Sequence, residues 1–440
     1  MKRLIFMTLC CLSCAAPLAA QEFTTLKGHG GPVMGLDVAP TGQVASASFD
    51  NSVGLWTDRT PLWLEGHDAA VIDVTFAGRD LLLTGGDDFQ VIAWHLDTGA
   101  HQTIVEHKGK VADIAYDAKR GLIATASWDG SIALRFVRTD AQGQTVFDEG
   151  PVLKGHTAGI NAVAFAKEGL FSASSDGSIR LWDIATGQSR AIVKHGFGVN
   201  ALVVDAEGEW LAYGAVDGGT RIVAPFTGAT LADLTLDRRP ILAMAHHAAS
   251  NQLAVGDGHG FIMMVDTKTR AITRDFRATR RGPVWALAFS QDGETVFAGG
   301  LDDVVYGWPV ALMDRFAPQM GQDRSFLQAP ETMPNGERQF MRKCSICHAL
   351  EPGASRKAGP TLHALFGRRA GTVPGYAYSP ILRGSEIIWS DDTIDQLFDL
   401  GPDHYIPGSK MPMQRIRSAR DRLDLIAFLK SYTHLKEQKP

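Results

Sequence analysis

Three residues near position 345 carry the most specific chemistry in this sequence. Cys344, Cys347 and His348 form a C-x-x-C-H motif, which is typical of covalent haem attachment. Two thiols at this spacing can each form a thioether with one haem vinyl group, and the adjacent imidazole then binds the iron. The alternative is half of a zinc site, which needs two further Cys or His ligands at close spacing. No cysteine follows Cys14 except this pair, so the motif favours haem c over zinc.

The first 20 residues have the features of a secretory signal peptide. Lys2 and Arg3 precede an apolar run over residues 4–12, and small residues follow up to position 20. A retained membrane anchor is an alternative, although the run is short for a bilayer span. A lipid-modified Cys14 is another alternative. Cleavage would leave no cysteines for a disulfide framework. Because haem is attached to such motifs outside the bacterial cytoplasm, motif and signal both predict a periplasmic protein.

Residues 21–312 contain one unit repeated seven times, and such a period predicts small units that stack on a shared core. Each unit contains a similar segment of 11 residues, which is residues 46–56 in the first unit. The fifth residue of this segment is, in order, Asp50, Asp88, Asp129, Asp176, Asp217, His259 and Asp302. The first five units also have an upstream histidine, namely His29, His67, His107, His156 and His195. Because these histidines recur at one structural position, we interpret them as structural residues and not as ligands.

Three of the upstream histidines follow a glycine, and the fourth unit ends in Trp182-Asp183. These Gly-His and Trp-Asp pairs resemble the motifs of the WD-repeat family. The resemblance implies an all-β, seven-bladed propeller in which His, Asp and Trp are joined through a Ser or Thr. We carry this network over to three sets, His29/Asp50/Trp56, His67/Asp88/Trp94 and His156/Asp176/Trp182. Unit three has Arg135 instead of the tryptophan. Units six and seven have Arg238 or Arg239 and Arg281 near the histidine position, so the network stays open there.

Four further expectations concern the repeat region. Phe23 to Leu26 should complete the blade that ends at Trp308, because this covers an open edge. Residues 139–150 are expected to be an inserted loop on one face. His246 and His247 fall outside the repeat position, and neighbours on a strand face opposite sides, so they are not expected to share a metal ion. No nucleotide, quinone or metal motif stands out in residues 21–312.

Residues 313–332 are interpreted as a linker, and residues 333–440 as a second, all-α domain. The order of motifs there resembles class I cytochrome c over about 100 residues. The haem motif is followed by Gly359-Pro360, the segment 374–379, Trp389 and a P-G-S-K-M string that ends at Met411. The resemblance implies these cofactor-binding residues: Cys344, Cys347, His348, Met411, Pro360, Arg368, Tyr378 and Trp389.

The same resemblance implies a role for each of these side chains. His348 and Met411 would bind the iron of one haem c, with Met413 as the alternative to Met411, and the Pro360 carbonyl would hold the imidazole. Tyr378 and Trp389 would bind a haem propionate, with Arg368 nearby. Gly336 and Phe340 would pack against Leu425 and Phe428 where the first and last helices cross. Leu397 or Phe398 stands where many members of the family have a tyrosine over the methionine.

An iron held by both His and Met has no open coordination site, so we expect an electron carrier with a raised redox potential and no catalytic residues. From residue 334 onward there are 16 Lys and Arg against 11 Asp and Glu, a net of +5. The remainder carries 27 against 37, a net of −10. Opposite charges can steer the haem edge towards an acidic surface, either the propeller or a partner. An ordinary solvated surface is the alternative.

These observations predict a periplasmic carrier of single electrons whose propeller is a docking platform for a redox partner protein. A nucleic-acid partner is not expected, and a peripheral membrane complex stays open. Two other function classes remain. One is an oxidoreductase whose propeller holds a catalytic cofactor and passes electrons to the haem. The other is a haem-bearing regulator or assembly factor.

Overall fold

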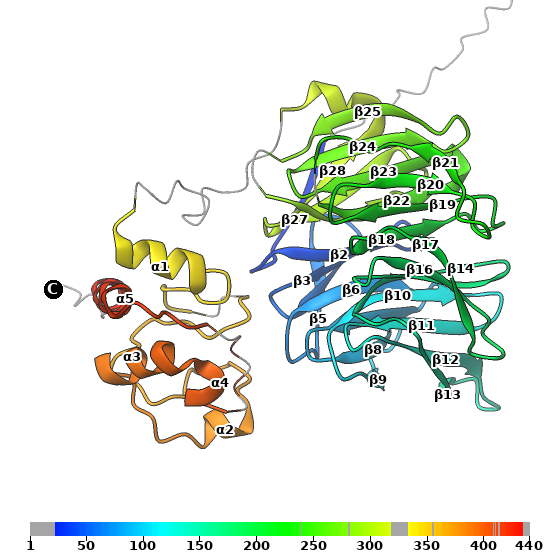
Figure 1. The fold of residues 1–440 in the computed structure, drawn as a ribbon. Coiled ribbons are helices and arrows are strands. Elements are labelled where there is room, and N and C mark those ends of the chain that lie inside the picture. Colours follow the sequence, from blue (N-terminus) through cyan, green and yellow to red (C-terminus); the bar gives the residue numbers. More distant parts are fainter. Residues whose placement is uncertain are drawn as a thin grey trace, which may run out of the picture.

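The structure is a computed structural model of the 440-residue chain. It describes residues 23–238, 240–279, 282–317, 333–353, 356–407, 409, 411 and 414–433. The predicted signal peptide lies outside the described residues, as does the part of the predicted linker after residue 317. A large β-domain and a smaller helical domain lie side by side (Figure 1).

The β-domain is a propeller of seven antiparallel, four-stranded sheets, which confirms the predicted number of blades. Blade one contains β2 (Val33–Val38), β3 (Val44–Ser48), β4 (Ser52–Trp56) and β5 (Pro61–Glu65). Blade two contains β6 (Val71–Phe76), β7 (Leu81–Gly86), β8 (Gln90–His95) and β9 (His101–Glu106). Blade three contains β10 (Val111–Asp117), β11 (Leu122–Ser127), β12 (Ser131–Thr139) and β13 (Thr145–Lys154). Blades four and five contain β14 (Ile160–Ala166), β15 (Gly169–Ser174), β16 (Ser178–Trp182), β17 (Ser189–Lys194); and β18 (Val199–Val204), β19 (Leu211–Ala215), β20 (Thr220–Val223), β21 (Thr230–Asp233). Blades six and seven contain β22 (Ile241–His247), β23 (Gln252–Asp257), β24 (Phe261–Asp266), β25 (Ala271–Arg277); and β26 (Val284–Phe289), β27 (Thr295–Gly300), β28 (Val304–Pro309), with β1 (Thr24–Lys27).

The first strand closes the ring, as the sequence predicts. β1 pairs with β28 in register from Thr24 opposite Gly307 to Lys27 opposite Val304. The Phe23 ring packs edge-on against the Trp308 ring, with the ring centres 4.8 Å apart. The N-terminal segment therefore occupies the edge that blade seven would otherwise expose.

Apolar clusters lie between neighbouring blades, which explains why a single unit could not fold alone. The cluster between blades one and two joins Leu55 and Val53 to Val74, Leu82 and Trp94. Equivalent clusters join the other neighbouring blades. Each sheet therefore buries its faces only when the next blade is present.

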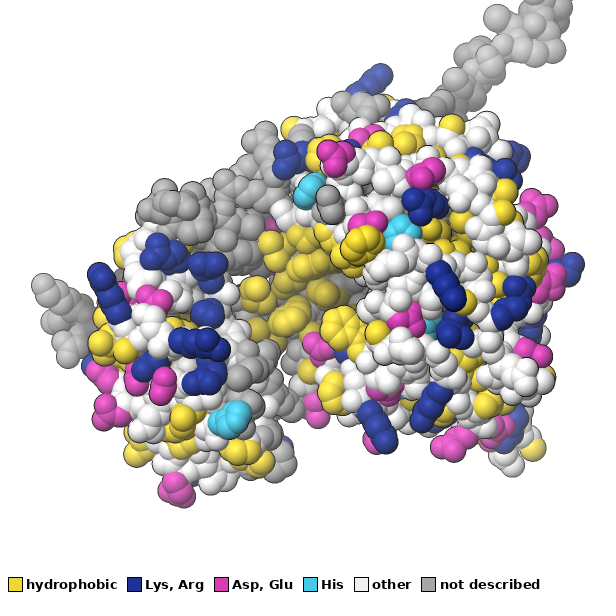
Figure 2. Space-filling model, viewed as in Figure 1, with side chains coloured by type: hydrophobic (Ala, Val, Ile, Leu, Met, Phe, Trp, Pro, Cys, Tyr) yellow, Lys and Arg dark blue, Asp and Glu magenta, His cyan; other side chains and the backbone are white. Residues whose placement is uncertain are grey.

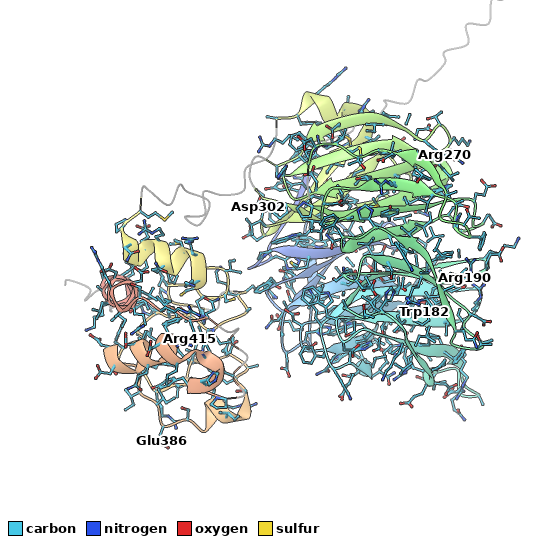
Figure 3. All side chains as sticks on the ribbon, in the orientation of Figure 1. Trp182, Arg190, Arg270, Asp302, Glu386 and Arg415 are labelled. Carbon is cyan, nitrogen blue, oxygen red and sulfur yellow. The ribbon has the colours of Figure 1, made fainter. Side chains whose placement is uncertain are left out.

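The three predicted histidine networks are present within their blades. In blade four, His156 Nδ1 donates to Asp176 at 2.9 Å, and His156 Nε2 accepts from the Ser172 hydroxyl at 2.8 Å. The buried Trp182 (Figure 3) donates its Nε1–H to the same hydroxyl at 2.7 Å. Blades one and two repeat this arrangement through Ser46 and Thr84. The networks leave these histidines no free nitrogen for a ligand.

The other four blades depart from this His, Asp and Trp arrangement to different degrees. In blade three, His107 keeps its bonds to Asp129 and Thr125, and Arg135 donates instead to the Ile104 carbonyl. Blade five pairs His195 with Asp217 at 2.8 Å. In blade six, Arg238 replaces the histidine and pairs with Asp257 at 2.6 Å, whereas Arg239 lies outside the described residues. The Tyr306 hydroxyl donates to Asp302 in blade seven, and Arg281 lies outside the described residues.

The expectation of an inserted loop at residues 139–150 is wrong. These residues extend blade three, because β12 and β13 stay paired up to Thr139 opposite Thr145. Asp140 closes the hairpin by accepting the backbone N–H groups of Gln142 and Gln144. Ladder hydrogen bonds and cross-strand contacts such as Arg138 with Asp148 stabilise the longer strands.

The C-terminal domain contains α1 (Asn335–Lys343), α2 (Pro380–Arg383), α3 (Asp391–Leu400), α4 (Pro402–Tyr405) and α5 (Ala419–Thr433). Short 3-10 helices also occur at Ala248–Ser250 and Val310–Arg315. α1 crosses α5 where predicted, since a Cβ atom on Gly336 would overlap the Asp424 carbonyl group, and the Phe340 and Phe428 ring centres lie 5.4 Å apart. Among the helices in the described ranges, none has the length and apolar character needed to cross a bilayer.

Candidate functional site

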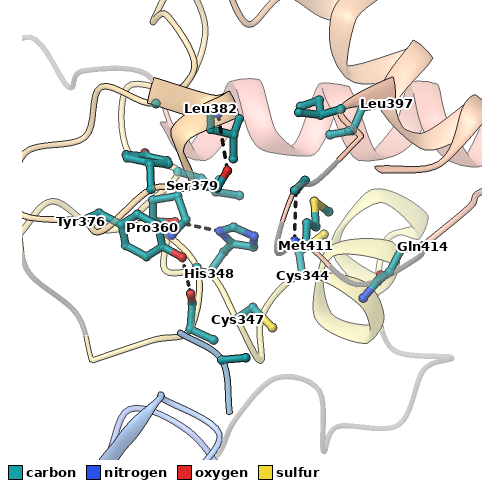
Figure 4. Close-up of a pocket in the computed structure, with 18 of the residues that line it drawn as sticks. Cys344, Cys347, His348, Pro360, Tyr376, Ser379, Leu382, Leu397, Met411 and Gln414 are labelled. Atoms are coloured by element: carbon teal, nitrogen blue, oxygen red, sulfur yellow. Dashed lines mark hydrogen bonds between the residues drawn. The ribbon is translucent and has the colours of Figure 1, made fainter. Parts of the chain in front are cut away.

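One buried cavity of about 440 Å³ collects the residues that the sequence singled out (Figure 4). All eight predicted cofactor-binding residues line it: Cys344, Cys347, His348, Pro360, Arg368, Tyr378, Trp389 and Met411. They come from the end of α1, from the loops after it and from the loop before α5. The fold therefore brings together side chains that lie up to 67 positions apart in sequence.

The two thiols lie at the end of α1 and are free in this structure. α1 ends at Lys343, and the Cys347 N–H donates to the Cys344 carbonyl at 3.0 Å in the turn that follows. Burial raises the pKa of Cys344 to about 12 and that of Cys347 to about 11. Both sulfurs are therefore protonated and lie at the wall of an apolar cavity, which suits them to covalent capture of an apolar group rather than to thiolate chemistry.

The His348 imidazole is held in one orientation. Its Nδ1–H donates to the Pro360 carbonyl at 2.8 Å (Figure 4). Gly359 allows this close approach, because a Cβ atom there would overlap the ring. Burial lowers the pKa of His348, which favours the neutral imidazole. The hydrogen bond at Nδ1 leaves the Nε2 lone pair as the free ligand, the arrangement that iron-binding histidines use.

Met411 lies on the loop between α4 and α5, and its side chain lines the cavity. Its backbone N–H donates to the Ser409 hydroxyl at 3.1 Å, which helps to fix the loop (Figure 4). The alternative, Met413, lies outside the described residues. Leu397 and Phe398, one of which stands where many members of the family have a tyrosine, are both buried and both line the cavity. The Met411 end of the cavity is therefore apolar.

Arg368, Tyr378 and Trp389 lie along another part of the wall. Arg368 is committed to the backbone, because its guanidinium donates to the carbonyls of His363 and Thr361. The Tyr378 hydroxyl accepts from the Val373 N–H at 3.4 Å. The structure thus places all three residues at the cavity wall, and a direct bond from any of them to a propionate stays a prediction.

Several cavity residues were missed by the sequence analysis. Tyr376 donates its hydroxyl to the Ala358 carbonyl, and burial raises its pKa to about 12. Gln414 has a buried Oε1 without a hydrogen-bond partner among the described residues, so its amide is suited to a polar group of a bound molecule. Tyr376 belongs to a segment that resembles the family, so closer attention to that segment could have found it.

The propeller forms part of the same cavity wall. The opposite net charges of the two regions leave the propeller open as a docking surface, but no pattern in the sequence indicates which of its turns contribute. The wall includes Phe49, Asn51, Asp68, Ala69, Asp87 and Phe89, from turns of blades one and two. Arg356 of the helical domain pairs with Glu65 at 2.7 Å and lies over the Trp63 ring at 4.1 Å. In Figure 2 the two domains face each other across a hollow with hydrophobic side chains on the propeller side.

His246 and His247 have separate partners, as expected for neighbours on a strand. His246 lies edge-on to Trp210, whereas His247 bonds Ser250 at 2.7 Å and the Gln291 carbonyl at 3.0 Å. Within the described ranges, no group of three or more His, Cys, Asp or Glu side chains could hold a metal ion. The propeller cavity around the ring axis is lined by Asp37, Asp73 and Asp113 among others.

The fold defines a WD-repeat propeller protein with a second, helical domain. The family described as WD domain, G-beta repeat matches residues 20–57, 100–134, 149–183 and 272–308. The chain is also 43% identical over 110 residues to cytochrome c of Sesamum indicum, 41% to that of Ginkgo biloba and 42% to that of Gossypium barbadense. These matches cover 25% of this chain and 96–98% of each relative. The chain therefore belongs to the cytochrome c family over those 110 residues.

Proposed function

We propose that the protein is an exported one-electron carrier, in which a class I cytochrome c domain holds one covalent haem c and the propeller is a docking platform. The observation that carries the proposal is the convergence of two free thiols, an oriented imidazole and a thioether on one apolar cavity. The donor set fits haem c, since the wall offers two thiols that could form thioethers, and a histidine and a methionine that could bind the iron.

Haem c, once attached, supplies an iron that gains and loses one electron. His348 would bind that iron through Nε2, because Nδ1 is committed to the Pro360 carbonyl. Met411 would bind from its own loop and close the sixth position, so that no substrate site remains. The aliphatic wall, which includes Leu365 and Leu397, would exclude water and favour the less charged ferrous state.

Export and partner binding are further parts of this proposal. Lys2, Arg3 and the apolar run that follows support a cleaved signal, and covalent haem attachment supports the periplasm. The excess of basic residues after position 334 supports docking of the carrier on an acidic surface of a redox protein. N-terminal sequencing of the protein purified from periplasm would test the cleavage.

The decisive experiment is spectroscopic. The purified protein is expected to keep its haem absorbance after denaturation and organic extraction, because thioethers hold the haem covalently. The Cys344→Ala/Cys347→Ala double variant should lose all of it, whereas the Cys14→Ala variant should retain it. Absence of extraction-resistant haem in the unmodified protein would overturn the proposal. A second, non-haem chromophore would instead favour an enzyme whose propeller binds its own cofactor.

A further inference from the structure

Turns of the propeller form part of the cavity wall. Phe89, at the turn between β7 and β8, is 43% exposed and belongs to the wall together with Phe49 and Asp68. Tyr376, from the opposite wall, lies close enough for the Asp68 charge to contribute to the rise in its pKa. The propeller turns therefore lie where a protein partner would otherwise approach the cavity.

Arg356 links the two domains through two contacts with the propeller. It combines the ion pair to Glu65 with stacking on Trp63, and the Trp63 ring in turn packs edge-on against His29. Both members of the ion pair are partly exposed, at 34% and 67% of their side-chain surface. Exposed ion pairs and cation–π contacts are individually weak, so a contact of this kind is readily reversed.

Gly30 shows that the propeller is adapted to this contact. The backbone N–H of Gly30 donates to Asp50 Oδ2, and Asp68, Lys108 and Thr157 donate in the same way to the equivalent aspartates of blades two to four. These three residues have side chains, so the local backbone accepts a Cβ atom at this position. In blade one, however, a Cβ atom on Gly30 would overlap the Arg356 carbonyl oxygen.

From these contacts we propose that the rim of blades one and two is a reversible, autoinhibitory cover for the electron-exchange edge of the haem cavity. This inference rests on the proposed function. In the docked state the Arg356 contact holds Phe89 and Asp68 at the cavity wall and keeps protein partners away. A partner gains access when the helical domain leaves the rim, and the chain between the domains keeps it tethered nearby.

The test uses the full haem-loaded chain and the Gly30→Thr variant, which copies the residue that blade four has at this position. The added side chain should separate the domains, so the radius of gyration from small-angle X-ray scattering should rise. The rate of electron exchange with an added ferrous cytochrome c should also rise, by roughly tenfold, which corresponds to about 1.4 kcal/mol of docking free energy. Thr157→Gly, the reverse change in blade four, is the matched control and should behave like the unmodified protein.

Arg356→Ala removes the clamp without touching the propeller, and it should give the same two changes if Gly30→Thr impairs folding. Variants with unchanged scattering and unchanged exchange rate would overturn the inference, as would separated domains without faster exchange. Failure of the proposed function would look different, because the unmodified protein would then lack extraction-resistant haem. Thermal unfolding of each variant shows whether the propeller is intact.

Discussion

The Nδ1 atom of His348 lies 2.8 Å from the carbonyl oxygen of Pro360, across twelve residues of chain. This single bond fixes the tautomer of the imidazole and leaves Nε2, on the other side of the ring, as the atom available to the cavity. It connects the C-x-x-C-H motif to a loop that contributes no ligand, and it shows why the two segments must fold together before the cavity exists.

Replacement of His348 by Ala should leave the haem covalently attached and remove one axial ligand. The absorption spectrum is expected to change from low-spin to high-spin, with a weakened Soret band at neutral pH. His363→Ala is the control, since His363 lies in the same domain but does not line the cavity. A low-spin spectrum in the His348→Ala protein would show that another residue binds the iron.

Replacement of Met411 by Ala should open the sixth position. The ferrous protein is then expected to bind about one carbon monoxide per haem at neutral pH, whereas the unmodified protein binds little. Met413→Ala distinguishes the two methionines of the same loop and should leave the protein resistant to carbon monoxide. Strong binding by the unmodified protein would mean that the sixth position is vacant or labile, and the carrier function would then be untenable.

Thr84 joins two side chains in blade two, because its hydroxyl is 2.7 Å from His67 Nε2 and 2.9 Å from Trp94 Nε1. Thr84→Val keeps the shape and leaves two buried polar groups without a partner, so it should lower the free energy of unfolding by about 2–3 kcal/mol. Thr103→Val in the same blade removes an exposed hydroxyl and should cost much less. Chemical denaturation of the two variants measures the difference, and equal stability would refute a structural role for the network.

The carboxyl group of Asp37 should make the propeller less stable as pH rises. Burial at the wall of the central cavity raises the pKa of Asp37 to about 6, although its Oδ2 accepts the Phe76 N–H. Since the folded state binds this proton more tightly than the unfolded state, stability is highest below about pH 4 and falls up to about pH 6. Because Asp37 is only partly buried, solvent screening limits the loss to about 1–2 kcal/mol.

The Asp37→Asn variant tests that slope, because an amide oxygen can still accept the Phe76 N–H without titrating. Thermal unfolding between pH 4 and 8 should show a smaller decline than in the unmodified protein. Part of the decline should remain, since burial also raises the pKa of Asp73 and of Asp113, the latter to about 7. Asp58→Asn, at an exposed turn, is the control. An unchanged slope in Asp37→Asn would assign the effect to the other carboxyl groups.

The local sequence determined a large part of this protein. The repeat period and the His, Asp and Trp positions predicted the seven blades, because stacked blades repeat the same contacts at regular spacing. The crossing of α1 and α5 was implied by the resemblance to class I cytochrome c. Eight residues of the cavity wall were also singled out, because the C-x-x-C-H motif and the resemblance to class I cytochrome c restrict the residue types at those positions. The insertion at residues 139–150 was correctly located but wrongly predicted to be a loop, because its mixed sequence gives no clear alternation and the strand pairing is fixed by the partner strand.

Only the tertiary structure decided how the two domains meet. Gly30 looks like one more turn glycine in the sequence, and Arg356 like one more surface charge, until the helical domain is placed against blades one and two. The choice of Arg238 as the partner of Asp257 also required the fold. Contacts between side chains hundreds of positions apart leave no periodic trace in a sequence, because each partner need only be polar, aromatic or small at its own position.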